Sequence, residues 1–472
     1  GLVNLSKADF TIVEADQVTF SSSVNAANFT QNGANTTTGL TTFDGKVDLT
    51  GAFDFTGRAL TINASGNLVG GTMDVTNSGV FTTADAADIT VTGQFTQDGS
   101  STSSLGSDLT ATAGMAFARA ILLTGSDAVT LATGGAAGQD IVLGTDASTD
   151  ITGSGQALTL NAGAAGDVTI EGDVGAANAA LGAITITNAD QVLFDETVTA
   201  ASFLQSAAPS TGLTTFDGLI DLSGNLTFTG QSLTFNGNGL LDNTVGGTMT
   251  VTNAGTLTTA DDATFSVTGF FTQLGNGHSV LGADLSSGAS INFNTNVTIT
   301  SADLVTITTG GADTEDLTIT GSITSSSNES LTMDAGELGD ITLTGAVDLG
   351  TGDLTITDAA VVDVADTLTA GIFTQSDGTT STTLHGTLDL SGKFDFTGQA
   401  LTLNALLDSD GSVEVSNAGT FTTAAAGAII ADLGFTQNGG GTSSLAGNIT
   451  TTDTNIGFAT GIALMGDLTM TT

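Results

Sequence analysis

Short triplets in which a threonine stands between two aliphatic residues recur along the chain and predict β-strands. Because successive side chains of a strand point to opposite faces, each triplet places two aliphatic side chains on one face and its threonine on the other. Where triplets follow one another they begin roughly 10 to 15 residues apart, and glycine, asparagine or aspartate closes them, which is typical of turns. The triplets are Leu60-Thr61-Ile62, Val129-Thr130-Leu131, Leu158-Thr159-Leu160, Val168-Thr169-Ile170, Ile184-Thr185-Ile186, Leu317-Thr318-Ile319, Leu331-Thr332-Met333, Ile341-Thr342-Leu343 and Leu354-Thr355-Ile356.

A longer unit of about 170 residues repeats above the level of the triplets. Residues 39–45 return unchanged as residues 212–218 and in altered form as residues 382–386. The segment Phe-Thr-Gln recurs at Phe29, Phe95, Phe271, Phe373 and Phe435. We divide the chain into copies at residues 15–188, 189–358 and 359–472, the third incomplete, with residues 1–14 as the end of a preceding copy.

The triplets and the long repeat together predict the fold. A three-residue strand buries too little surface to be stable alone, whereas stacked coils of such strands cover one another's apolar ends. We therefore predict an all-β fold for residues 1–472, a right-handed parallel β-solenoid whose hand follows from the crossover rule. Coils of about 20 residues with a strand spacing of ~4.8 Å would give a rod on the order of 110 Å long, with the Phe-Thr-Gln phenylalanines stacked inside.

A globular β-sandwich is the main alternative fold. It would show longer alternating strands and hairpin turns of the Asn-Gly type at short, regular spacing. Asn32-Gly33 and Asn438-Gly439 are present, but both follow Phe-Thr-Gln inside a repeat unit. The pattern therefore favours the solenoid.

The amino-acid composition limits which partners the chain can bind. Among 472 residues, 5 are Lys or Arg and 49 are Asp or Glu, which gives a net charge of −44. Such a chain repels nucleic acids and anionic membranes, and no apolar run is long enough for membrane insertion. The absence of cysteine excludes disulfides, cysteine zinc sites and a cysteine nucleophile. The chain begins Gly1-Leu2-Val3, so we expect any signal peptide to have been removed or to lie outside it.

The repeats lack cysteine and are rich in Thr, Asn and Gly. In this composition and periodicity the chain resembles the β-strand-repeat surface proteins of bacteria, namely the filamentous-haemagglutinin type and autotransporter passengers. The resemblance implies an exported bacterial protein, extracellular or on the cell surface, that forms a stalk, an adhesin or a fibre. It carries no family-specific motif, so no functional residue follows from it.

Catalytic chemistry is not expected. His278 and His385 have no second histidine or glutamate at zinc-site spacing, and His385 occupies the turn position that Asp44 and Asp217 hold in the other copies. No nucleophile elbow or phosphate-binding loop occurs. We therefore predict no catalytic residue, no cofactor-binding residue and no required cofactor.

A β-helix enzyme that degrades polysaccharides is the minor alternative. It needs paired carboxylates, or a basic residue beside a calcium site. The basic residues are scattered: Lys7, Lys46, Arg58, Arg119 and Lys393. Asp48, Asp221 and Asp389 recur once per copy, which indicates a turn position whose carboxylate accepts backbone N–H bonds rather than an active site.

Calcium or other divalent cations could associate diffusely with acidic turns, since carboxylates suit hard cations and screening lowers the repulsion between stacked coils. Specific signals are incomplete. Residues 310–313 only partly match the Gly-Gly-x-Gly-x-Asp calcium repeat, and Asp408-Ser409-Asp410-Gly411 opens like a calcium loop but has Gly419 where a glutamate is required. Metal-ligating residues therefore stay undefined.

Two functions are consistent with the sequence. The first is structural: a segment or protomer of a surface fibre, sheath or stalk that self-associates end to end or laterally, because neither end resembles the cap that closes a solenoid. The second is an adhesin that binds a glycan or a cell surface. The adhesin needs an insertion in one copy, and the differences between copies, around Pro209 and residues 236–245, are small.

Overall fold

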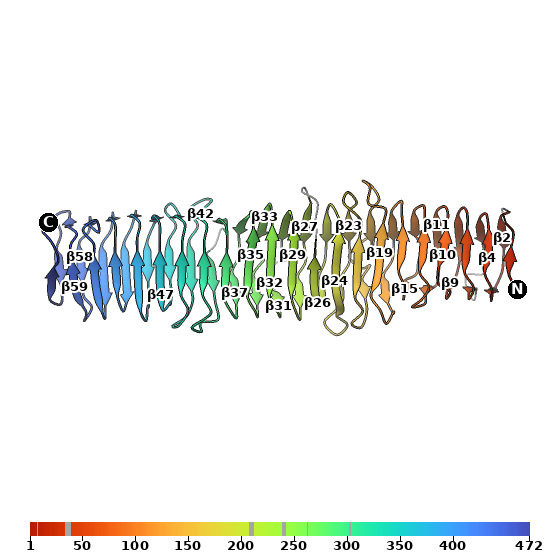
Figure 1. Ribbon diagram of the computed structural model, residues 1–472, viewed down its shortest axis with the longest axis horizontal. Helices are drawn as coiled ribbons and strands as arrows, with labels where there is room; N and C mark the ends of the chain where they lie inside the picture. Colours follow the sequence, from red (N-terminus) through yellow and green to blue (C-terminus); the bar gives the residue numbers. More distant parts are fainter. Residues whose placement is uncertain (7, 34–38, 207–211, 238–241, 262, 302–303) are drawn as a thin grey trace. The chain divides into compact units, whose positions relative to one another are not determined.

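In a computed structural model of the chain, the triplets form strands that coil turn upon turn (Figure 1). The structure describes residues 1–6, 8–33, 39–206, 212–237, 242–261, 263–301 and 304–472. None of these residues lies in a helix. The chain forms two compact units, Gly1–Asn238 and Gly239–Thr472, and the boundary falls inside the second sequence copy.

In the first unit each turn contributes three strands, and each strand pairs in parallel with a strand one turn later. Ladder A comprises β1 (Val3–Asn4), β4 (Val24–Ala26), β7 (Val47–Leu49), β10 (Asn67–Val69), β13 (Ile89–Val91), β16 (Leu109–Ala111), β19 (Val129–Thr133), β22 (Leu158–Asn161), β24 (Leu181–Asn188), β26 (Val198–Gln205) and β29 (Leu226–Gly230). Ladder B comprises β2 (Phe10–Val13), β5 (Phe29–Asn32), β8 (Phe53–Gly57), β11 (Met73–Asn77), β14 (Phe95–Gln97), β17 (Met115–Phe117), β20 (Ile141–Leu143), β23 (Val168–Ile170), β25 (Val192–Phe194), β27 (Leu213–Phe216) and β30 (Ser232–Phe235). Ladder C comprises β3 (Gln17–Phe20), β6 (Leu40–Phe43), β9 (Ala59–Ile62), β12 (Phe81–Thr83), β15 (Ser103–Leu105), β18 (Ile121–Leu123), β21 (Ile151–Thr152) and, through Val174 and the start of β26, β28 (Ile220–Leu222).

The second unit has the same three-strand turn. Ladder D comprises β31 (Asn243–Val245), β34 (Phe265–Val267), β37 (Leu285–Ser287), β40 (Val305–Thr308), β43 (Leu331–Asp334), β46 (Leu354–Ile356), β49 (Phe373–Gln375), β52 (Phe394–Gly398), β55 (Val413–Asn417), β58 (Phe435–Gln437) and β61 (Ile456–Phe458). Ladder E comprises β32 (Met249–Asn253), β35 (Phe271–Gly275), β38 (Ile291–Phe293), β41 (Leu317–Ile319), β44 (Ile341–Leu343), β47 (Val361–Val364), β50 (Ser381–Leu384), β53 (Leu401–Leu403), β56 (Thr420–Thr423), β59 (Thr442–Leu445) and β62 (Ile462–Leu464). Ladder F comprises β33 (Thr256–Thr259), β36 (His278–Leu281), β39 (Val297–Ile299), β42 (Ile323–Ser325), β45 (Val347–Asp348), β48 (Leu368–Ala370), β51 (Leu388–Leu390), β54 (Leu407–Ser409), β57 (Ile429–Ala431), β60 (Ile449–Thr451) and β63 (Met470–Thr471).

The predicted all-β parallel solenoid is confirmed. Every pairing given above is parallel, which excludes the β-sandwich. In all nine triplets both aliphatic side chains are buried and the threonine is partly exposed, as alternation along a strand requires. Among the described pairings, turn length varies widely, from 18 residues between paired Ser103 and Ile121 to 30 between paired Ile121 and Ile151. Loops therefore absorb insertions while the strands keep their register.

Phenylalanine stacks fill parts of the core, as predicted, but the stacks are short. Phe29 packs face to face on Phe10 and Phe53, with ring centroids 5.9 Å and 4.8 Å apart. Phe271 instead meets Phe293 at 5.0 Å with the rings tilted by 47°. A stack ends wherever the next turn supplies an aliphatic residue, so it does not continue along a whole ladder.

A buried pair of amides recurs in each copy, and its asparagine is the last residue of a five-residue strand. Gln273 Nε2 donates a hydrogen bond to Asn253 Oδ1 at 2.7 Å, and Asn253 Nδ2 donates to the Gly255 carbonyl at 2.9 Å. The equivalent bonds join Gln97 to Asn77 at 2.6 Å and Gln437 to Asn417 at 2.7 Å. Because a buried amide without a partner costs about 1–3 kcal/mol, this pair favours one register of adjacent turns.

The long repeat is out of phase with the three-strand turn. In the second unit, equivalent segments of copies two and three form β32 and β55, which belong to ladders E and D. By strand number, β55 is the twenty-third described strand after β32, one short of eight full turns. The first unit shows the same step, since β8 of copy one lies in ladder B and β29 of copy two in ladder A. Each copy therefore shifts equivalent residues by one ladder.

Candidate functional site

Aspartates that immediately precede strands form the corners between turns. Asp140 Oδ1 accepts the backbone N–H of Asp167, one turn later, at 2.9 Å, and Asp167 Oδ1 accepts that of Gln191 at 3.1 Å. Asp316 Oδ1 likewise accepts the backbone N–H of Asp340 at 3.0 Å. Each carboxylate thus satisfies a backbone donor outside the ladder and ties one turn to the next.

Stacking these carboxylates changes their acidity. Partial burial raises the pKa of Asp340, the neighbouring Asp316 and Asp313 raise it further, and the hydrogen bond from Val361 opposes the shift. Partial burial likewise raises the pKa of Asp408, with Asp389 adding to the effect. The acidic turns therefore repel one another, and this repulsion would be reduced by protons or cations.

The surroundings of Glu329 lower its pKa, in contrast to those of Asp340 and Asp408. Although burial alone would raise its pKa, hydrogen bonds from Ser325, Ser326 and the backbone of Ser327 lower the pKa to about 2. Three donors converge on one carboxylate, so Glu329 is a structural anion that holds its turn together.

The sequence interpretation of Asp48, Asp221 and Asp389 as turn residues is wrong. They lie in the middle of β7, β28 and β51, with their side chains pointing outward between two buried aliphatic residues. An apolar–Asp–apolar triplet has the same alternation as an apolar–Thr–apolar triplet and forms a strand for the same reason. The aspartates at the corners are different residues, among them Asp167, Asp316 and Asp340. Their position could have been recognised in the sequence, because each directly precedes an apolar–Thr–apolar triplet.

His385 takes the place of an aspartate, as predicted from the repeat. Asn63 Nδ2 donates to Asp44 Oδ1 at 2.8 Å in copy one, and Asn404 Nδ2 lies 3.1 Å from His385 Nδ1 in copy three. The other ring nitrogen of His385 is 3.0 Å from Asp363 Oδ1. The substitution keeps the contact between turns, so His385 is a structural residue.

The segment that opens like a calcium loop is not a loop. Asp408 and Ser409 belong to β54, and the Ser409 hydroxyl donates to the Gly392 carbonyl at 2.7 Å. Across the described ranges, no three His, Asp or Glu side chains are grouped so that they could hold a metal ion.

The basic residues stay apart in the structure, and Lys7 lies outside the described residues, as do Pro209 and residues 238–241. Lys46 Nζ is 3.3 Å from Asp48 and Lys393 Nζ is 2.7 Å from Asp395, and each lysine directly precedes the strand that holds its aspartate. Arg119 Nε donates to the Gly99 carbonyl at 3.1 Å. Each contact is local and joins residues of the same or adjacent turns.

One surface groove gathers polar side chains of a different kind. It has a volume of about 490 Å³, lies against β36, β39 and β42, and includes His278, for which the sequence predicted no catalytic role. Asn276, Asn294 and Asn296 line it together with Thr295, Thr298, Gly321, Ser322 and Thr324. None of these nine described residues is acidic. The sequence interpretation treated His278 alone and therefore missed the amides that stacking places beside it.

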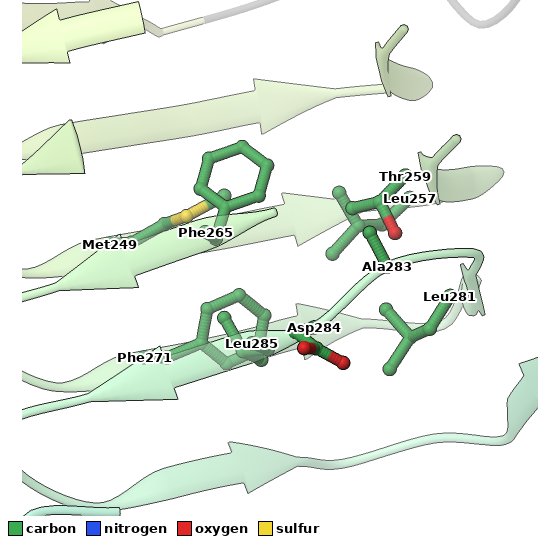
Figure 2. A pocket seen from close by; sticks show the side chains of 9 residues that line it. All are labelled: Met249, Leu257, Thr259, Phe265, Phe271, Leu281, Ala283, Asp284 and Leu285. Carbon is green, nitrogen blue, oxygen red and sulfur yellow. The ribbon is translucent and has the colours of Figure 1, made fainter. Parts of the chain in front are cut away.

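The core of the second unit also contains a small closed void of about 10 Å³ (Figure 2). Met249, Leu257 and Phe265 lie on one side of it and Phe271 and Leu285 on another. A void of this size with apolar walls is at the lower limit for one water molecule. It is a packing defect rather than a ligand site.

The void coincides with an exchange of residues between copies. Where copies one and three have Phe81 and Phe421, copy two has the smaller Leu257. In the next strand along the chain, copies one and three have Ile89 and Ile429, and copy two has the larger Phe265. The aromatic ring has moved to a neighbouring position, and the replacement does not fill the same space.

The chain matches no protein-family model, no curated protein and no solved structure. Within the described ranges no helix has the length and apolarity that crossing a membrane requires.

Proposed function

We propose that the chain is a structural protein of the cell surface, a β-solenoid segment or protomer of a fibre, sheath or stalk without catalysis. The observation that carries the proposal is the repeated tie between turns. Each copy places the same buried amide pair at the end of a five-residue strand, so the bond between turns recurs with the repeat. The resemblance to exported bacterial β-strand-repeat proteins supports an extracellular location.

End-to-end association is part of this proposal. In the last described turn, β61, β62 and β63 are not buried, and Leu464 and Met465 are 63% and 68% exposed. A further turn of the same kind, from the same chain or from a second copy, would cover these side chains and pair with the strand edges. Lateral association would bring acidic turns together, so divalent cations would promote it.

Electron microscopy and light scattering of purified residues 1–472 test the proposal. We expect filaments that lengthen with protein concentration and that bundle when Ca²⁺ is added and separate when it is chelated. Leu464→Asp should shorten the filaments, because it places a charge in the contact between turns. Leu122→Asp, at a side chain 45% exposed on the side of ladder C, is the matched control and should leave the length unchanged. A monodisperse monomer at all concentrations would contradict the proposal.

A further inference from the structure

The side chains of the amide-lined groove in the second unit are specific to copy two at the positions that can be matched among the described residues. Its residues are outward-facing positions of β36, β39 and β42 and of the turns before them. Copy one has Ser100, Thr102, Ala118 and Ala120 where copy two has Asn276, His278, Asn294 and Asn296. Copy three has Gly440, Thr442, Ala459 and Gly461 there. The inward phenylalanines and glutamine of this segment recur in every copy, whereas the outward amides do not, so the stacking of turns does not require these amides.

The floor of the groove is held in place by hydrogen bonds. Asn296 Oδ1 accepts the backbone N–H of Ser322 at 3.0 Å, which leaves its Nδ2 group available. The Thr298 and Thr324 hydroxyls are 3.1 Å apart. Thr295 Oγ1 donates to Gln273 Oε1 at 3.1 Å and so connects the groove to the buried amide pair. The polar groups are therefore preorganised, which lowers the entropy cost of binding.

The rim of the groove has unused hydrogen-bonding capacity. Asn276, His278 and Asn294 are exposed. Within the described part of the chain, their side chains form no hydrogen bond. Each amide offers a carbonyl acceptor and two N–H donors, and a neutral imidazole offers one donor and one acceptor. The groove thus presents mixed donors and acceptors along successive turns that lie ~4.8 Å apart.

We propose that this groove binds a neutral oligosaccharide. Sugar hydroxyls donate and accept, as the amides and threonines of the groove do, and a volume of about 490 Å³ lies within the ~300–1,000 Å³ typical of ligand sites. A chain with a net charge of −44 disfavours sulfated or uronic-acid sugars. Because no aromatic ring lines the groove, affinity comes from hydrogen bonds alone, and we expect millimolar dissociation constants for single sites.

The binding test uses a panel of neutral gluco-, manno-, galacto- and N-acetylglucosamine-oligosaccharides, measured by saturation-transfer NMR on the full chain. We expect at least one probe to bind, and the variant Asn276→Ala/Asn294→Ala to weaken that binding at least tenfold. Both positions are exposed, so the variant should keep the unfolding midpoint of the parent chain. The matched control is Ser100→Ala/Thr102→Ala at the equivalent positions of copy one, which should bind as the parent does.

Several results would overturn this assignment. They are no binding by any neutral probe at millimolar concentration, equal loss in the groove variant and the copy-one control, and preferential binding of acidic sugars. The outcome is independent of filament formation, since Leu464→Asp should shorten filaments without changing sugar binding, and the groove variant should do the reverse.

Discussion

Copies one and two place the same inner residues under different outer surfaces. The segment from Phe95 to Phe117 and the segment from Phe271 to Phe293 both begin and end with a buried phenylalanine, and both contain the buried glutamine of the amide pair. Outside, Thr102 and Ala118 of copy one correspond to His278 and Asn294 of copy two. Inward positions thus maintain the solenoid, while outward positions are free to change chemistry.

Removing a core ring should have the largest effect and should be equal in the two copies. Phe117→Ala and Phe293→Ala each delete a fully buried side chain, so we expect a loss of about 3–5 kcal/mol in the free energy of unfolding. Asn294→Ala, one residue after Phe293, should change it by less than about 0.5 kcal/mol. Chemical denaturation measures all three, and a large effect of Asn294→Ala would mean that outer positions also hold the fold.

Removing the buried glutamine should distinguish the copies. Gln273→Met leaves Asn253 Oδ1 without its donor and removes one of the two acceptors of the Thr295 hydroxyl, which keeps its bond to the Gly277 carbonyl; the buried acceptor should cost about 1–3 kcal/mol. Gln97→Met, which removes the same bond to Asn77 in copy one, is the control and should cost a similar amount. Only Gln273→Met should also weaken sugar binding, because Thr295 lines the groove. Equal sugar affinity in both variants would show that the buried amide pair does not support binding in the groove.

The exchanged rings of the core should be coupled. Leu257→Phe alone overfills a void of about 10 Å³, and Phe265→Ile alone enlarges it, so each should destabilise the chain by about 1–3 kcal/mol. The double variant restores the pattern of copies one and three and should cost less than the sum of the two. A double-mutant cycle measures the coupling, and strict additivity would show that the two positions repack independently.

The smallest expected effect is a shift of stability with pH. Burial raises the pKa of Asp167, Asp340 and Asp408, so the folded chain binds their protons more tightly than the unfolded chain does. Their contribution is complete below the ordinary value of 3.8 and is lost as pH rises through the folded pKa. Glu329 acts in reverse, because its pKa of about 2 lies below the ordinary 4.5, and its contribution is lost as pH falls from 4.5 towards 2.

Thermal unfolding between pH 7 and pH 2 should therefore give a midpoint that rises as pH falls from 7 towards 4 and declines below that. Asp340→Asn keeps an acceptor for the Val361 N–H and should flatten the rise. Glu329→Gln should reduce the decline on the acid side. A midpoint that falls steadily from pH 7 would contradict the assignment of the raised pKa values.

The fold could be predicted because its signal is local. Leu158-Thr159-Leu160 alternates in the same way wherever its partner strand lies, so periodicity alone indicates the inner and outer faces. The same rule should have placed Asp48 on the outer face of a strand. Asp48 was interpreted as a turn residue because it recurs once per copy, although its two neighbours, Val47 and Leu49, carried the strand pattern.

The groove could not be predicted because its residues meet only through register. Asn276 and Ser322 lie on turns whose lengths differ, and 18 residues separate His278 from Asn296. Register depends on turns that are between 18 and 30 residues long in the described pairings, and no local pattern shows how much of each turn lies in loops that bulge outward. Comparing copies position by position would have found the amides, whereas considering each histidine singly did not.

The number of strands between equivalent segments, 23 from β32 to β55, is not a multiple of the three strands in a turn. Within each unit, equivalent residues of successive copies move to the adjacent ladder, from B to A in the first unit and from E to D in the second. A feature gained by a copy and inherited by its duplicate would therefore lie on a neighbouring ladder and not directly in line with the first. A glycan bound at one copy would not obstruct a glycan bound at the next copy. Duplication of the sequence would thus distribute binding sites over different faces of a solenoid.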